Sequence, residues 1–399
     1  MEPTATESPR KPIKLLVVDD EPDLELLIRQ KFRRQIRSEE YRFVFARNGV
    51  EALHTLQAQP DIDIVLSDIN MPEMDGLTLL MKLNELNLLL KAVIVSAYGD
   101  MSNIRTAMNR GAADFLTKPI DFQDFEVTVA KTVKQLETLR AAMREHDQLL
   151  AIRHELDIAR DIQLSSLPRT FPAFPERTDF DIFAQMLPAR DVGGDFYDFF
   201  LVDADRLGLV IGDVSGKGIP AALFMAVSRS LLKSTALEGG SPADCLRHVN
   251  ALLCLDNASE MFVTVFYAIL NTRTGDLAYS NGGHNPPYIL RRGAPPEALP
   301  GTGDMVLGAI GEMSYRLKQA TLEPGDSVFL YTDGVTEAMD ESGQLFSDQR
   351  LRTFLEHVHA ATPEQIVHGV IDDVKRYAGA AQQSDDLTAL AVTFQPERA

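Results

Sequence analysis

The sequence predicts two domains of different fold class, a doubly wound α/β domain with a parallel sheet and a following α+β domain, joined by a long helix. Three observations lead to this prediction. From residue 13 to about 122, short apolar runs alternate five times with helical patterns, as in sheets built from βα units. Helical periodicity then continues without Gly or Pro as far as Pro168. Beyond it, strands that follow one another through short turns favour antiparallel sheets.

The composition restricts the class of protein. The 399 residues are 45% hydrophobic and 24% charged, which is ordinary for a globular protein. No apolar run reaches the roughly 18 to 20 residues needed to span a membrane, and the first residues lack the apolar core of a secretory signal, so we expect a cytoplasmic protein. The net charge of −19 argues against nucleic acid as a partner. Two cysteines, Cys245 and Cys254, are too few for a disulfide framework or a zinc site, and we expect inert thiols.

The first domain is expected to have five buried strands, at residues 13–18, 43–47, 62–67, 92–97 and 113–117. Ligands of doubly wound sheets bind at the carboxyl ends of the strands. At those ends stand Asp19, Asp20, Asp68, Ser96 and Lys118. Three converging carboxylates repel one another unless a cation such as Mg²⁺ lies among them, and a lysine with a hydroxyl can hold phosphoryl oxygens. Asp68 would then be the nucleophile that forms an acyl phosphate.

The segments VVDDEP, LSDINMPEMDG, VSAYGD and DFLTKP resemble the motifs of response-regulator receiver domains, over about residues 13–122. The resemblance implies that Asp68 is the phosphoacceptor and that a sensor histidine kinase is a partner. The Mg²⁺ site that it implies consists of Asp19, Asp20, Asp68 and the Asn70 carbonyl. It further implies two phosphate sensors and an aromatic switch residue, which are Ser96, Lys118 and Phe115, and a Lys118–Pro119 bond that can be cis.

Residues from about 122 to 165 form the predicted linker helix, with two apolar stripes that are out of phase. The first stripe is Val129, Val133, Leu136 and Met143, and the second is Leu149, Ile152, Leu156 and Ala159. Arg140, Asp147 and His154 are polar residues between them. The helix either packs on its neighbours or forms a parallel coiled coil between two protomers, and we favour the coiled coil and hence a homodimer.

The proline-rich segment LPRTFPAFPERTDF marks the end of the linker. The predicted organisation is a disordered N-terminus at 1–12, the first domain at 13–122, the helical linker at 123–167 and the second domain at 168–399.

The second domain places acidic residues at strand ends. Asp195 stands in DVGGDFYDFF, next to aromatic residues, and is tolerable there on a solvated strand face or beside a cation. Asp213 lies in VIGDVSGKG, Asp333 in FLYTDGV, and Asp385 with Asp386 in SDDLTALAV. Each alone is typical of a turn or cap. Together they predict an oxygen-ligand site for Mg²⁺ or Mn²⁺, in which two metals would activate a water for attack on a phosphoryl group.

The segment GDVSGKG is not a nucleotide-binding P-loop. Three residues rather than four separate Gly212 from Gly216, and Gly218 replaces the required Ser or Thr.

Five segments, VGGDFYD, IGDVSGKG, NGGHNPP, YTDGVTEA and SDDLT, resemble the SpoIIE-type branch of the PPM serine/threonine phosphatases, over about residues 150–396. The resemblance implies a β-sandwich of two antiparallel sheets flanked by helices, with a dimetal centre between the sheets. It implies that Asp213 bridges both metals, with the shells completed by the Val214 carbonyl, Asp195, Asp333 and Asp385. The segment DIARDIQLSSLP, residues 157–168, resembles the helix through which regulatory input enters this family.

Four further residues are left with alternatives. Arg190 either binds the substrate phosphate or is a surface charge. His284 either protonates a leaving oxygen or fixes a turn, which we favour. Asp386 is a possible metal ligand, and Asp198 is expected to be structural.

These observations predict a response regulator whose output is metal-dependent dephosphorylation of phosphoserine or phosphothreonine, gated by phosphorylation of Asp68. By family resemblance, the substrate would be an anti-sigma-factor antagonist. The alternative is a non-catalytic adaptor that binds an anti-sigma factor or its antagonist. The four aspartates that the family uses as ligands are all present, which favours the enzyme.

Overall fold

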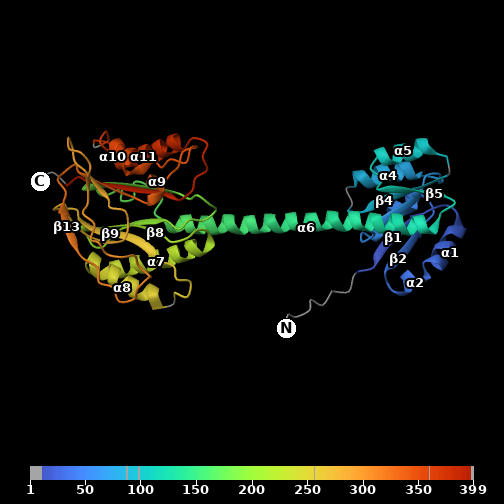
Figure 1. Cartoon of the computed structure of the whole chain (residues 1–399), viewed down its shortest axis with the longest axis horizontal. Coiled ribbons are helices and arrows are strands. Elements are labelled where there is room, and N and C mark those ends of the chain that lie inside the picture. Colours follow the sequence, from blue (N-terminus) through green and yellow to red (C-terminus); the bar gives the residue numbers. More distant parts are fainter. Residues whose placement is uncertain (1–10, 87–88, 98, 256, 359, 397–399) are drawn as a thin grey trace. The chain divides into compact units, whose positions relative to one another are not determined.

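The structure is a computed structural model that describes residues 11–86, 89–97, 99–255, 257–358 and 360–396. It divides into two compact units, Met1–Ala151 and Ile152–Ala399 (Figure 1). Most of the predicted disordered N-terminus, and Tyr98 of the VSAYGD segment, lie outside the described residues. The predicted domain boundaries stay a prediction, because one helix crosses the division between the units.

The first unit contains the predicted five-stranded parallel sheet, in the order β2-β1-β3-β4-β5. Its elements are β1 (Ile13–Val18), α1 (Pro22–Lys31), α2 (Arg33–Arg37), β2 (Tyr41–Ala46), α3 (Gly49–Ala58), β3 (Ile64–Asp68), α4 (Gly76–Glu85), β4 (Lys91–Ala97), α5 (Met101–Asn109) and β5 (Asp114–Lys118). Alternate residues of β1 fill two apolar cores on opposite faces of the sheet. Leu16 packs with α3, α4 and α5, and Leu15 packs with α1 and with the start of the long helix that follows β5. Burial on both faces explains why the strands are apolar throughout. The α/β prediction is confirmed.

The predicted linker is a single helix, α6 (Phe122–Ser166). Its first turns belong to the first unit, where Phe125, Val129 and Leu136 are buried. Arg140, assigned above to a polar position between the stripes, donates to the Asp63 carboxylate at 2.6 Å. Several apolar residues farther along α6 are exposed, namely Leu139, Met143, Leu149, Leu150, Ile152, Ile158 and Ile162. Exposed apolar residues are compatible with a paired helix, and the coiled coil stays a prediction.

The second unit is a β-sandwich of two five-stranded antiparallel sheets, in the orders β13-β10-β9-β8-β7 and β12-β11-β14-β15-β6. Its strands are β6 (Phe180–Leu187), β7 (Phe196–Leu201), β8 (Arg206–Val214), β9 (Val263–Asn271), β10 (Asp276–Gly282), β11 (Tyr288–Leu290), β12 (Glu297–Ala298), β13 (Lys318–Thr321), β14 (Ser327–Tyr331) and β15 (Leu387–Phe394). Its helices are α7 (Ile219–Leu237), α8 (Pro242–Leu255), α9 (Asp333–Thr336), α10 (Ser347–Leu355) and α11 (Pro363–Ala378).

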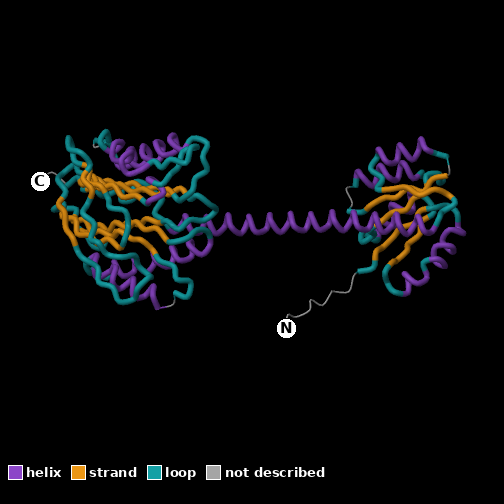
Figure 2. Tube along the Cα trace, in the orientation of Figure 1, coloured by secondary structure: helices purple, strands orange, loops and turns teal. Residues whose placement is uncertain are grey.

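Helices cover both outer faces of the sandwich (Figures 1 and 2). The sheet that contains β8 and β9 is covered by α7 and α8, while α10 and α11 lie on the other sheet. Alternating burial along β6, with Phe180, Ile182, Ala184 and Met186 turned inward, is the pattern of a strand whose two faces differ. The predicted fold of the second domain is confirmed.

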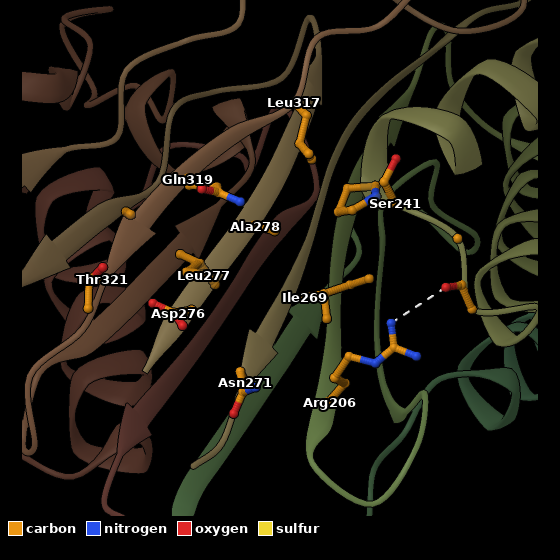
Figure 3. A pocket seen from close by; sticks show the side chains of 14 residues that line it. Arg206, Ser241, Ile269, Asn271, Asp276, Leu277, Ala278, Leu317, Gln319 and Thr321 are labelled. Carbon is orange, nitrogen blue, oxygen red and sulfur yellow. Dashed lines mark hydrogen bonds between the residues drawn. The ribbon is translucent and has the colours of Figure 1, made fainter. Parts of the chain in front are cut away.

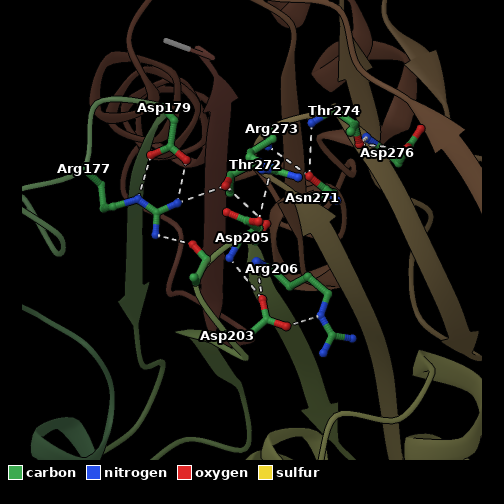
Figure 4. A network of polar contacts seen from close by, with 11 residues as sticks. Arg177, Asp179, Asp203, Asp205, Arg206, Asn271, Thr272, Arg273, Thr274 and Asp276 are labelled. Atoms are coloured by element: carbon green, nitrogen blue, oxygen red, sulfur yellow. Dashed lines mark hydrogen bonds and ion pairs between the residues drawn. The ribbon is translucent and has the colours of Figure 1, made fainter.

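One end of the sandwich is closed by a network of polar contacts (Figure 4). Arg177 donates to both carboxylate oxygens of Asp179 at 2.8 and 2.6 Å, and to the Thr272 hydroxyl at 2.9 Å. Asp203 accepts from Arg206 at 2.6 Å in the turn between β7 and β8. The contacts join three connections of the sandwich, which is a structural role.

The structure also bears on the cysteines and on membrane-spanning helices. Burial raises the pKa of Cys245 to about 12, so this thiol stays protonated. In the part of the chain that the structure describes, no helix combines the length and apolar character needed to cross a bilayer.

Candidate metal and phosphoryl-transfer sites

Three carboxylates meet at the carboxyl edge of the parallel sheet. The ligand oxygens of Asp19, Asp20 and Asp68 lie within 4.8 Å of one another. Asp19 and Asp68 are buried and Asp20 is exposed. Burial raises the pKa of Asp19, although the Glu21 N–H and Lys118 oppose this shift. A partly buried group of carboxylates that is open on one side fits a hard divalent cation.

Lys118, at the end of β5, lies against the same carboxylates. Its ammonium group is 2.7 Å from Asp68, 3.0 Å from Asp19 and 3.1 Å from Glu21. Burial lowers the pKa of Lys118, but hydrogen bonds to these carboxylates outweigh it and raise the pKa above its usual range. The lysine is therefore a fixed positive charge beside Asp68. The Lys118–Pro119 bond is cis.

The remaining receiver residues lie around this group. Ser96, on β4, is 1% exposed, and its hydroxyl has no hydrogen-bond partner among the described residues. Such an unpaired buried hydroxyl suits a ligand oxygen. Phe115 is half-buried on β5, and Asn70 is exposed in the turn after β3. That turn requires Gly76, because a Cβ there would lie 2.1 Å from the Asp68 carbonyl oxygen.

In the second unit, Asp195 lies between the two sheets with 2% of its surface exposed. Its Oδ2 accepts hydrogen bonds from the Thr332 hydroxyl at 2.7 Å and the Thr388 hydroxyl at 2.6 Å. Burial, and then the carboxylates of Asp213 and Asp386, raise the pKa of Asp195 well above its ordinary value. The solvated-face alternative for Asp195 is therefore wrong, because the side chain is buried.

Asp213 is on β8. Asp333 is the first residue of α9, and β14 ends two residues earlier, at Tyr331. Burial raises the pKa of Asp213 to about 7, with the carboxylates of Asp333, Asp385 and Asp386 adding to it and a hydrogen bond with Asp195 opposing it. Burial, Glu337 and Asp385 likewise raise the pKa of Asp333. Carboxylates that destabilise one another's charged form in this way fit a site for cations.

The carboxylates of this second group are more widely spaced than those of the first. Among the described residues, its carboxylates include no set of three whose ligand oxygens lie within 4.8 Å of one another. One reason is that Asp385 is paired with a cation of the chain itself. Lys217 lies 2.7 Å from the Asp385 carboxylate and donates to the Ser384 carbonyl at 2.6 Å.

Asp386, a possible metal ligand from the sequence, is instead used by the backbone. Its carboxylate accepts N–H groups of Ala189 at 2.8 Å, Gly194 at 2.7 Å and Asp195 at 3.3 Å. A Cβ on Gly193 would lie 2.3 Å from the Asp386 carboxylate, so this approach requires glycine. The two glycines before Asp195 thus allow β7 to begin against Asp386, and this arrangement favours a structural role for that residue.

Gln163 was not identified from the sequence as a functional residue. It lies near the end of α6, is 7% exposed, and pairs with Gly193 in both directions. The Gln163 amide donates to the Gly193 carbonyl at 2.5 Å, and the Gly193 N–H donates to Gln163 at 3.0 Å. The only sequence signal was its place in the segment DIARDIQLSSLP. This pairing ties α6 to the loop that carries Asp195.

His284 is buried with both ring nitrogens engaged. Nδ1 lies 2.8 Å from the Thr264 hydroxyl, and Nε2 lies 3.1 Å from the Tyr331 carbonyl. Burial lowers the pKa of His284 to about 4. A neutral imidazole that joins β9 to the end of β14 favours the turn-fixing interpretation over proton transfer.

Asp198 and Arg190 take no visible part in the acidic group. Asp198 pairs with Arg229 at 2.7 Å and Lys233 at 3.3 Å on α7, as expected of a structural residue. Arg190 is exposed before the glycines. The Val214 carbonyl lies near Gly194, where a Cβ would approach it to 3.0 Å.

A separate cavity of about 560 Å³ lies between the α7–α8 connection and strands β8, β9, β10 and β13 (Figure 3). It is lined by Arg206, Ser241, Ile269, Asn271 and Asp276, among others, and contains none of the aspartates predicted as ligands. It therefore does not belong to the candidate metal site.

Comparisons with known proteins divide the chain in the same way. A model of the family described as Stage II sporulation protein E (SpoIIE) matches residues 203–395, and one for the response regulator receiver domain matches residues 15–130. Asp195 precedes the first match. Protein IcfG of Synechocystis sp. is 32% identical over 271 residues, which are 60% of this chain and 41% of IcfG.

Phosphoserine phosphatase RsbU of Bacillus subtilis is 30% identical over 256 residues, which are 63% of this chain and 74% of RsbU. The SiaA-PP2C domain of Pseudomonas aeruginosa is a solved structure with a TM-score of 0.56 and 24% identity, covering 62% of this chain and 99% of that one. The latter similarity shows the fold alone.

Proposed function

The chain belongs to the SpoIIE-type family of protein serine/threonine phosphatases and carries a response-regulator receiver domain, and from this premise we propose that its output is metal-dependent hydrolysis of phosphoserine or phosphothreonine on a protein. The observation that carries the proposal is the group formed by the buried Asp195 and the partly buried Asp213 and Asp333. Burial raises the pKa of each of these carboxyl groups, so without cations they disfavour their own charged form. Burying charged carboxylates together lowers the stability of the fold unless a cation pairs them.

In the proposed centre, Asp213 would be a ligand of both cations, Mg²⁺ or Mn²⁺. The other ligands, direct or through water, are the Val214 carbonyl, Asp195, Asp333 and Asp385. Bound cations would supply Lewis-acid activation of a water and charge stabilisation at the phosphoryl oxygens. The chain's own part is orientation: the Thr332 and Thr388 hydroxyls hold Oδ2 of Asp195, and Asp195 also shares a hydrogen bond with Asp213.

For the receiver unit, we propose Asp68 as the residue that accepts a phosphoryl group from a sensor histidine kinase. The Mg²⁺ ligands would be Asp19, Asp20, Asp68 and the Asn70 carbonyl. Lys118 already lies 2.7 Å from Asp68, and the unpaired Ser96 hydroxyl would donate a hydrogen bond to a phosphoryl oxygen. Phe115, half-buried on the same strand as Lys118, would be the aromatic switch.

The proposed route from the receiver to the phosphatase is α6. Its first turns pack in the first unit, and Gln163 near its other end pairs with Gly193, two residues before Asp195. A change in the position or pairing of α6 would therefore move the loop that carries a proposed metal ligand. Phosphorylation controls activity only if it stabilises the two states of α6 unequally.

The proposed substrate is a phosphorylated anti-sigma-factor antagonist, which follows from the family resemblance. The exposed apolar residues of α6, including Leu149 and Ile152, support a homodimer through this helix. Sedimentation of the full-length protein as a monomer would rule out that assembly.

The test is Mn²⁺-dependent hydrolysis of p-nitrophenyl phosphate and of a phosphoserine peptide. We expect turnover by the wild type and by Asp276→Asn, which changes an exposed aspartate of β10, and loss of turnover in Asp213→Asn. Beryllofluoride, which mimics receiver phosphorylation, is expected to change the rate only when Asp68 is intact, so Asp68→Asn should not respond. A folded protein without turnover in any receiver state would contradict catalysis and favour the adaptor.

A further inference from the structure

A small pocket of about 190 Å³ opens beside the candidate metal centre of the second unit. It lies between the segment that follows α9, the C-terminal end of α11 and the loop before β15. Its lining includes Gly334, Met339, Val374, Ala378, Asp385 and Leu387. No residue of this pocket other than Asp385 has a role in the function proposed above.

The pocket shares a wall with the metal centre. Asp385 is one of the proposed ligands, and Gly334 directly follows another, Asp333. Gly334 is held against the next strand, since a Cβ there would lie 1.9 Å from the Asp386 carbonyl oxygen. A side chain one or two residues from a phosphoserine held at the centre is therefore within reach of this pocket, because an extended chain advances only about 3.3 Å per residue.

The pocket walls are held in place by hydrogen bonds. The segment from Ala338 to Phe346 folds back on itself, with Met339 paired to Leu345. The Tyr377 hydroxyl, on α11, donates to the Gln344 and Leu345 carbonyls at 3.1 Å each. The Ala380 N–H donates to the Glu341 carboxylate at 3.1 Å. Both sides of the pocket are thus tied together.

The lining is mostly apolar. Val374 and Leu387 lie beneath the pocket and are almost fully covered, at 1% and 3% exposure, so the accessible apolar surface comes from Ala378 and Met339, with Lys375, Gln382, Gln383 and Ser384 at the polar side. Met339, 45% exposed, is a large apolar side chain at the mouth of the pocket. The volume is below the roughly 300–1,000 Å³ of pockets that bind small molecules, and it suits a single side chain.

We infer that this pocket is a specificity subsite that receives one apolar side chain flanking the phosphorylated residue of the protein substrate. The inference depends on the proposed phosphatase function. The occupant is an aliphatic side chain of leucine or methionine size, because Met339 and Ala378 offer apolar surface at the pocket wall. Asp385, at the edge shared with the metal centre, is engaged by Lys217 and proposed to hold a cation, which leaves the apolar wall formed by Met339 and Ala378 for the substrate side chain.

The experiment compares two phosphoserine peptides that differ only in the residues next to the phosphoserine, leucine in one and glycine in the other. For the wild type with Mn²⁺, we expect kcat/KM to favour the leucine peptide by about tenfold, chiefly through KM. Met339→Lys, which places a charge at the mouth, and Ala378→Leu, which fills the pocket, should each reduce that preference to near one. Leu237→Lys, a change at an exposed leucine of α7, should keep it.

Hydrolysis of p-nitrophenyl phosphate, which has no flanking residues, should be equal in the wild type and all three variants. Anisotropy of the labelled peptides bound to Asp213→Asn measures the same preference without turnover. An enzyme that hydrolyses nothing while binding the leucine peptide more tightly would refute the phosphatase proposal and leave the subsite standing. Equal affinity for both peptides, or a preference that survives both pocket variants, would overturn the subsite. A loss of self-association in Met339→Lys would assign the pocket to a contact between copies instead.

Discussion

Removal of metal should make the second unit less stable as the pH rises toward neutrality, because of Asp213. Its pKa is raised from 3.8 to about 7 by burial and neighbouring carboxylates. An acid whose pKa is higher in the folded state contributes stability below its unfolded pKa, and this contribution is lost as the pH rises through the folded pKa. A shift of about three units corresponds to roughly 4 kcal/mol in total.

Between about pH 5.5 and about pH 7.5, roughly 2 kcal/mol of that total is lost, since the folded-state pKa lies inside this interval. For a unit of this size the loss lowers the Tm by roughly 4–8 °C. Calorimetry in excess chelator measures it, with the relevant transition identified as the one that Asp213→Asn moves. Asparagine cannot ionise, so this variant should show a smaller decrease, with the remainder due to Asp195 and Asp333, while Asp276→Asn should retain the full decrease. Added Mg²⁺ or Mn²⁺ should stabilise the wild type more at the higher pH.

The reasoning is refuted if the wild-type transition, relative to that of Asp213→Asn, is level or rises over this pH interval. Such a result would mean that the carboxylates are relieved without metal, by water or by a shift of the surrounding loops.

Two further changes test single contacts of the second unit. Gln163→Met removes both hydrogen bonds to Gly193 and leaves a buried N–H and C=O unpaired, so the unit should lose about 2–4 kcal/mol of stability, measured by denaturant unfolding; an effect no larger than that of Gln148→Met, on an exposed part of the same helix, would contradict this. Lys217→Gln removes the cation paired with Asp385, so the metal-free protein should bind Mn²⁺ several-fold more tightly in calorimetric titration; weaker binding would mean that Lys217 positions the carboxylate rather than competes for it.

Much of the receiver site could be predicted from the sequence. The acids, the hydroxyl and the lysine each follow an apolar run, and the ends of parallel strands in one sheet meet at one edge by geometry. Asp19, Asp68 and Lys118 therefore had to converge once the βα alternation was recognised. The fold class of the second domain was likewise accessible, from short turns between strands and from its resemblance to a known family.

The roles of individual acids in the second domain were decided only by the tertiary structure. Asp385 and Asp386 are adjacent in the sequence, yet one pairs with Lys217 and the other accepts backbone N–H groups, including that of Gly194, which is 192 residues away. Gln163 and Gly193 are 30 residues apart and carry no pattern that pairs them. A sequence shows which residues can carry charge or donate hydrogen bonds. Which carboxylate is desolvated and which is paired depends on burial and on distant backbone groups, and these exist only once the two sheets have packed.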